Sequence, residues 1–144
     1  MFMIFKSLSS NDETSHVALY NLFLVHTIIL RSGHILDSIQ VNDQHFGASK
    51  DRGPDITTIN LAYGEKVTSI QYNLAKNGFS YCNFIIYTSK FIRPYGPYAI
   101  KDNYAYCNKN SPITRRYISN GAFLEYMQQY SQLNPDGQIQ LKWT

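Results

Sequence analysis

The residues best suited to bind a ligand are hydrogen-bond acceptors at one position of a nine-residue phrase that the chain contains three times. The copies span residues 33–41, 64–72 and 121–129. Each begins with Gly, has apolar residues three and six positions later and Gln seven positions later, whereas its fifth residue changes between Asp37, Thr68 and Glu125. A carboxylate there can accept two charge-assisted hydrogen bonds from adjacent hydroxyl groups, and the N–H groups of a tight turn supply donors. The phrase therefore marks candidate binding loops.

The phrase also predicts the elements that position these acceptors. Glycine accepts positive φ, so a leading Gly before an apolar run predicts a turn that enters a strand. Three copies in one short chain predict an all-β domain with pseudo-threefold symmetry. The repeated apolar positions should then share one core. They are Leu36, Ile39, Val67, Ile70, Leu124 and Met127.

The rest of the chain agrees with an all-β domain. Residues 27–30 and 36–41 flank a turn at Ser32 and Gly33 as a hairpin would, and the polar stretch 42–55 is predicted to be a loop. Residues 122–133 have some helical potential, but the repeat predicts that this segment begins as a strand. The other expected elements are strands in 56–61 and 84–88, a turn at Tyr95-Gly-Pro-Tyr98, and a turn followed by a strand in 134–144.

Composition excludes several classes of function. The chain has 144 residues, which suits one domain, and its 12 Tyr and 8 Phe favour pleated, half-buried surfaces. The net charge of +3 comes from scattered basic residues, so nucleic-acid binding is not expected. No nucleophile lies in a recognisable elbow, and the four His lack metal-ligand spacing. We therefore expect neither an enzyme nor a bound metal or other cofactor.

The two cysteines and the apolar segments bear on the compartment. Cys82 and Cys107 are too few for a disulfide framework, so they are predicted to be buried free thiols, which favours a reducing compartment such as the cytoplasm. The apolar start of the chain lacks the features of a signal peptide. The apolar stretch 17–30 is interrupted by Asn21 and His26 and is too short for a membrane span.

Several segments in order resemble the jacalin-related lectins. They are Gly33-His-Ile-Leu-Asp37-Ser-Ile39, a glycine-containing loop, residues 59–67, residues 84–90 and Tyr95-Gly-Pro-Tyr98. The resemblance runs from about residue 27 to about residue 130 and implies one lectin domain over residues 1–144. It implies a β-prism of three four-stranded Greek-key sheets, with metal-independent sugar binding at loops on one end.

The resemblance also implies where the sugar sites lie. The family's main site matches Gly121, Ala122, Phe123, Leu124 and Glu125, although its N-terminal Gly-Gly partner is replaced here by Ser9-Ser-Asn-Asp-Glu13. A second site, found in some members, matches Gly33, His34, Ile35, Leu36 and Asp37. Its partner would be the loop at residues 46–54, which includes Gly53.

Two interpretations of these loops remain open. In the first, the chain is a lectin for hexoses of the mannose, glucose or galactose type, its partners are glycans or glycoproteins, and a homodimer adds multivalency. In the second, it is a degenerate prism that serves as a protein-interaction or structural module, and Asp37 only bonds the backbone of its own turn. The loop at residues 47–54 discriminates between them, because the lectin interpretation expects it to fold against residues 33–37 with N–H groups that converge on the carboxylate.

Overall fold

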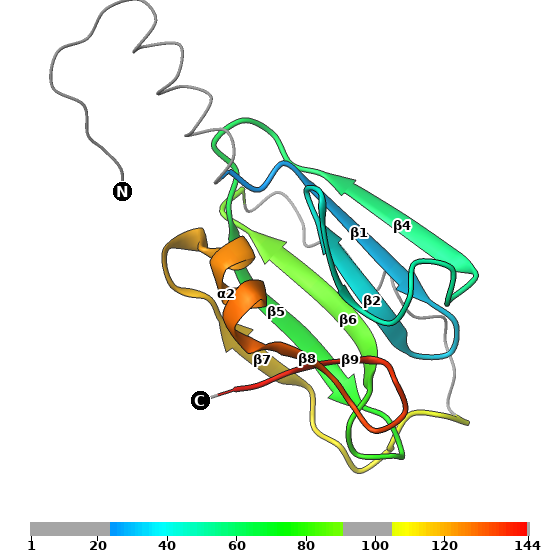
Figure 1. Cartoon of the computed structure of the whole chain (residues 1–144). Helices are drawn as coiled ribbons and strands as arrows, with labels where there is room; N and C mark the ends of the chain where they lie inside the picture. Colours follow the sequence, from blue (N-terminus) through cyan, green and yellow to red (C-terminus); the bar gives the residue numbers. More distant parts are fainter. Residues whose placement is uncertain (1–23, 91–104, 144) are drawn as a thin grey trace, which may run out of the picture.

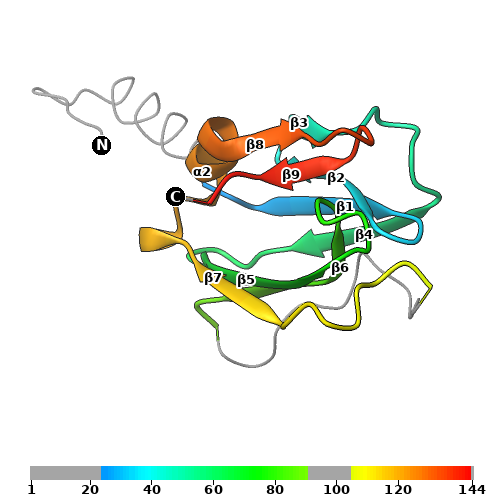
Figure 2. The ribbon, with the colours of Figure 1, turned by 90° about the horizontal axis from the view of Figure 1, so that it is seen from below.

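The computed structural model describes residues 24–90 and 105–143. In these residues nine strands form three antiparallel sheets, with one α-helix and one short 3-10 helix (Figure 1). Apolar side chains from all three sheets and from the helix pack into a single buried cluster. The fold class is therefore all-β, with the sheets arranged around one core as in a β-prism (Figure 2).

The first sheet has the strand order of a Greek key. It contains β1 (Thr27–Ser32), β2 (Leu36–Val41), β3 (Gln44–Gly47) and β4 (Asp55–Asn60), in the order β3-β2-β1-β4. The predicted hairpin and the predicted strand in 56–61 are confirmed. The prediction of an unbroken loop over 42–55 was wrong, because β3 lies within it. β3 is a short edge strand with polar residues and little apolar alternation, so the sequence pattern did not predict it.

The other two sheets are smaller. The second contains β5 (Val67–Leu74), β6 (Tyr81–Thr88) and β7 (Thr114–Tyr117), in the order β6-β5-β7. The third contains β8 (Ser131–Leu133) and β9 (Ile139–Leu141), joined by the turn that the sequence predicted. In the described residues the sheets hence have four, three and two strands, rather than four each.

In the first copy of the phrase, the fifth residue is the extra residue of a β-bulge. Arg31 pairs with Ser38 across the first hairpin, and Ser32 pairs with Leu36, so Asp37 has no partner in the ladder. A bulge inserts one residue and changes which side chains face inward. As a result, positions three residues apart in this strand can both face the core.

The second copy has the same irregularity at its equivalent position. Val67 pairs with Thr88 and Ser69 pairs with Tyr87, which leaves Thr68 as the extra residue of β5. The carbonyl groups of the two bulged residues also accept equivalent backbone hydrogen bonds. The Asp37 carbonyl accepts a hydrogen bond from Ala48 N at 3.1 Å, and that of Thr68 accepts one from Ile118 N at 2.9 Å.

The third copy folds differently, and the prediction that it begins as a strand was wrong. The segment forms η1 (Ser119–Gly121) and then helix α2 (Phe123–Tyr130). Residues three apart lie on one face of a helix, so Leu124 and Met127 reach the core without a bulge. All six repeated apolar positions are buried, as predicted, but the third copy does not share the bulged-strand geometry of the first two.

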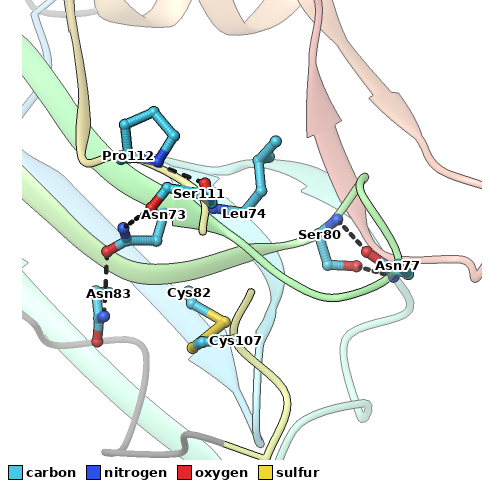
Figure 3. Close-up of a disulfide and its surroundings, with 9 residues drawn as sticks. All are labelled: Asn73, Leu74, Asn77, Ser80, Cys82, Asn83, Cys107, Ser111 and Pro112. Carbon is cyan, nitrogen blue, oxygen red and sulfur yellow. Dashed lines mark hydrogen bonds between the residues drawn. A yellow bond between two sulfur atoms is a disulfide. The ribbon is translucent and has the colours of Figure 1, made fainter. Parts of the chain in front are cut away.

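The prediction of free thiols was also wrong, since Cys82 and Cys107 form a disulfide (Figure 3). Both residues are buried, as expected. The bond joins β6 to the segment that precedes β7, and hydrogen bonds from Asn73 to Ser111 O (3.2 Å) and from Leu74 N to Ser111 Oγ (3.0 Å) hold the same segment. Because the two cysteines are bonded, they do not favour a reducing compartment.

Some expectations fall outside the described residues. They are the turn at Tyr95-Gly-Pro-Tyr98, the loop at residues 9–13 and the first part of the apolar stretch at 17–30. Across residues 24–90 and 105–143, no helix has the length and apolar character required to cross a bilayer.

Candidate functional site

Four connections gather at one end of the molecule, around the first copy of the phrase (Figure 1). They are the β1–β2 turn, the β3–β4 loop (residues 48–54), the β5–β6 turn and the β8–β9 turn. Asp136 in the β8–β9 turn accepts hydrogen bonds from Arg52 in the β3–β4 loop, at its carbonyl (3.0 Å), and from Asn77 in the β5–β6 turn, at its carboxylate (2.6 Å). These contacts bring residues far apart in the sequence to a single surface.

Asp37 lies at the centre of this end, in its bulge at the start of β2. Only 5% of the residue is exposed, because the β3–β4 loop closes over it. Gly53 adopts a φ of +92°, and a Cβ atom there would come within 2.7 Å of Asp37 Oδ2. The β3–β4 loop therefore packs directly on the candidate acceptor, through a position that excludes any larger side chain.

Arg52 supplies the charge that faces this carboxylate. Its Nε lies 3.4 Å from Asp37 Oδ1 in an ion pair, and the Arg52 side chain is 44% exposed. Gly137 makes room for the guanidinium, because a Cβ at that position would lie 2.8 Å from Arg52 Nη1. Arg52 thus links Asp37 to the β8–β9 turn and presents its remaining N–H donors beside the carboxylate.

Burial raises the pKa of Asp37 above its usual value, although the Arg52 charge and the Gly33 N–H hold the increase back. An anion in this position retains strong acceptor capacity that water does not saturate. The site accordingly combines a buried acceptor with an adjacent cationic donor. A carboxylate beside a guanidinium can accept from and donate to neighbouring hydroxyl groups.

The other residues of the first predicted loop have different surroundings. His34 is exposed and stacks on Tyr106, with ring centroids 4.2 Å apart and planes 7° apart. Ile35 is partly buried against the core and Leu36 is fully buried. The side chains of Ile35 and Leu36 hence support the loop, while His34 and Tyr106 line its outer side.

The second predicted loop lies at the opposite end of the molecule. Gly121, with a φ of +67°, lies against the side chain of Lys66, and Gln128 of α2 donates a hydrogen bond to Gln44, the first residue of β3, at 2.7 Å. Phe123 and Leu124 are core residues. Ala122 and Glu125 are exposed, with Glu125 in the first turn of α2. The structure therefore does not bring the two predicted loops together.

A buried polar network fixes the β8–β9 turn beside Asp37. Asn134 Nδ2 donates to Ser80 Oγ at 3.0 Å, and Ser80 Oγ donates to Gln138 Oε1 at 3.1 Å. Asn77 bonds the same hydroxyl at 2.8 Å and also holds Asp136. Satisfied networks of this kind make a connection rigid. The turn is consequently a fixed wall of the site.

Sequence reasoning missed three residues of this end: Arg52, Tyr106 and Asp136. Arg52 stands directly before the predicted Gly53, which was its only signal. Tyr106 precedes Cys107, and its position depends on a segment that the disulfide holds. Asp136 was recognised only as part of a turn. Within the described residues, no three His, Cys, Asp or Glu side chains gather in a way that could hold a metal ion.

Solved structures similar to this chain include two structures of a banana lectin. Malaysian banana lectin and a single-substitution variant of it align with this chain with TM-scores of 0.47 and 0.48. Both are 16% identical to it, and the alignments cover 66% and 67% of each chain, respectively. No protein-family model matches the sequence, and no curated protein matches it.

Proposed function

We propose that this protein is a lectin domain of the jacalin-related type that binds a hexose at Asp37 without a metal ion. The observation that carries this proposal is the β3–β4 loop, which packs Gly53 on one oxygen of Asp37 and pairs Arg52 with the other. A turn acid that served only its own backbone would not require a second loop to close over it.

The proposed binding mode uses the groups already described. Asp37 accepts hydrogen bonds from two neighbouring hydroxyls, and Arg52 together with turn N–H groups donates to the sugar oxygens. One hydroxyl takes the place of Arg52 Nε at Asp37 Oδ1, and the partly exposed guanidinium moves onto the sugar. His34 and Tyr106 border the same site.

A single site of this kind binds weakly, because sugar hydroxyls exchange bonds to water for bonds to protein. Presentation of several sites raises the apparent affinity without new contacts. We therefore propose a homodimer formed at an exposed strand edge, with glycans or glycoproteins as partners.

A sugar titration followed by NMR tests the proposal. Methyl mannoside and methyl galactoside are added to the wild type, to Asp37→Asn and to the matched control Glu125→Gln. We expect Asp37→Asn to weaken binding by about 1 kcal/mol or more, roughly five- to tenfold, because a charged acceptor becomes a neutral one. Glu125→Gln should bind like the wild type.

Two results would contradict the proposal. Ligand shifts that persist unchanged in Asp37→Asn would place the sugar elsewhere. No shifts across a panel of simple sugars would favour the degenerate prism that acts as a protein-interaction or structural module.

A further inference from the structure

The outer face of the first sheet contains a shallow cavity that the proposed hexose site does not use. It has a volume of about 210 Å³ and lies over β1, β2 and β3, with contributions from β4 and from the loop after β3. Strand side chains alternate between faces, so Ile29 and Arg31, which alternate with the buried Ile28 and Leu30 of β1, point outward into it. Drug-sized ligands occupy cavities of roughly 300–1,000 Å³, so this one suits a single small group.

The charged side chains that line the cavity are all basic. Arg31 and Lys50 line it together with His45 and Gln40, and no acidic residue does. The pKa of Asp51 is lowered by a hydrogen bond from Ser49 and, to a smaller degree, by the Arg31 charge, but Asp51 is exposed and lies outside the lining. The cavity therefore favours an anion.

Existing hydrogen bonds orient these groups. Arg31 Nη1 donates to the carbonyl of Gly53 at 3.1 Å, which leaves its other N–H groups as donors. His45 Nε2 donates to the carbonyl of Ala48. Arg31 and His45 are thus fixed against opposite ends of the β3–β4 loop, and Lys50 reaches the cavity from the loop between them. Such positioning reduces the ordering that a ligand must impose.

Two apolar side chains complete the lining, and they narrow the class of ligand. Ile29 and Ile56 form part of the wall, and Ile56 is 55% exposed in this structure. A bare inorganic anion gains nothing from aliphatic surface, whereas a sugar acid offers both a carboxylate and a ring face of C–H groups.

From this combination we infer that the cavity binds the carboxylate and ring of one acidic monosaccharide unit, such as a uronic acid. Arg31 and Lys50 hold the carboxylate, Gln40 and His45 border the ring hydroxyls, and the two isoleucines contact the ring face. This inference does not rest on the hexose site, because neither Asp37 nor Arg52 lines the cavity. A glycan with an acidic residue next to a neutral one could contact both sites.

The test compares glucuronate with glucose, which share a ring and differ by the carboxylate, and with inorganic phosphate. Backbone amide shifts are followed in the wild type, Lys50→Gln, Lys50→Arg and the control Lys142→Gln. We expect glucuronate to shift the amides of Arg31, Gln40, His45 and Lys50, with affinity about fivefold lower in Lys50→Gln. Lys50→Arg should retain binding, as should Lys142→Gln and Asp37→Asn.

Each contrary outcome overturns a defined part of the inference. Equal binding of phosphate and glucuronate would reject the sugar ring as a recognised element. Glucuronate shifts confined to Asp37 and its neighbours, or no shifts at all, would reject the cavity as a site. The expected result, in which Asp37→Asn loses hexose binding but retains glucuronate binding, would show that the two sites are independent.

Discussion

Asp37 and Glu125 hold the same position in two copies of one phrase, but their surroundings have little in common. Asp37 is the extra residue of a β-bulge, 5% exposed, and covered by a loop from elsewhere in the sheet. Glu125 lies in the first turn of a helix and is exposed to solvent. The contrast shows that an acid and a preceding glycine do not make a site. A second segment must close on the acid and supply donors.

Removal of the disulfide should have the largest effect on stability, and in the folded state its local effect should be confined to the Asp37 end. The bond closes a loop across a sequence separation of 25 residues, so replacement of Cys82 and Cys107 by Ala should cost about 3 kcal/mol in the free energy of unfolding. Tyr106 should also lose its stack on His34, because it adjoins Cys107. Urea melts measure the stability, and NMR shifts of His34 and Glu125 measure the local effect.

A reducing agent provides the control for this prediction. It should destabilise the wild type to the same extent and leave the double variant unchanged. Equal stability of the oxidised wild type and the double variant would contradict it.

Gly53→Ala should show how much the closure of the β3–β4 loop over Asp37 contributes to the difference between Asp37 and Glu125. The substitution adds a methyl group 2.7 Å from Asp37 Oδ2 at a φ of +92°, so unfolding free energy should fall by about 2 kcal/mol, together with sugar affinity. Gly64→Ala is the matched control. It has a φ of +80° but no atom within 4 Å of the added carbon, so it should cost about 1 kcal/mol and leave affinity unchanged. Equal losses in both would mean that the contact with Asp37 is unimportant.

Arg52→Gln should change how sugar binding depends on pH. The Arg52 charge holds down the pKa of Asp37, so without it the carboxylate protonates at higher pH. Sugar affinity should fall about threefold at neutral pH, and its decline on acidification should begin earlier than in the wild type. Calorimetric titrations over a pH series measure both. An unchanged pH profile would show that Arg52 does not act on the Asp37 charge.

The smallest expected effect concerns the stability of Asp37→Asn. Because burial raises the pKa of Asp37 above 3.8, the folded state prefers the protonated acid. The stability from this preference is present below the usual pKa and is lost as the pH rises through the raised value. The variant should therefore be at least as stable as the wild type at pH 7, with the difference closing toward pH 3. A clear loss of thermal stability at pH 7 would show that the Arg52 ion pair outweighs the burial of the charge.

Local signals in the sequence accounted for much of the fold but for only part of the site. The hairpin around Gly33 and the strand after Gly64 were predicted because Gly turns and apolar runs act over a few residues. The burial of Asp37 was not foreseen, since a turn acid is expected to be solvated. The pairing partner Arg52 lies 15 positions away in sequence, in a segment taken for a loop, and no local pattern linked them.

By itself, the sequence determined the all-β class, the core positions of all three phrases and the turn that leads to Asp37. These follow from side-chain polarity and backbone preference, which are properties of neighbouring residues. Only the tertiary structure decided that the third phrase is a helix, that Cys82 and Cys107 are bonded, and that Asp37 rather than Glu125 has a loop closed over it. Each of these depends on which distant segments pack together. An apolar spacing of three fits a helix or a bulged strand equally well until its neighbours are in place.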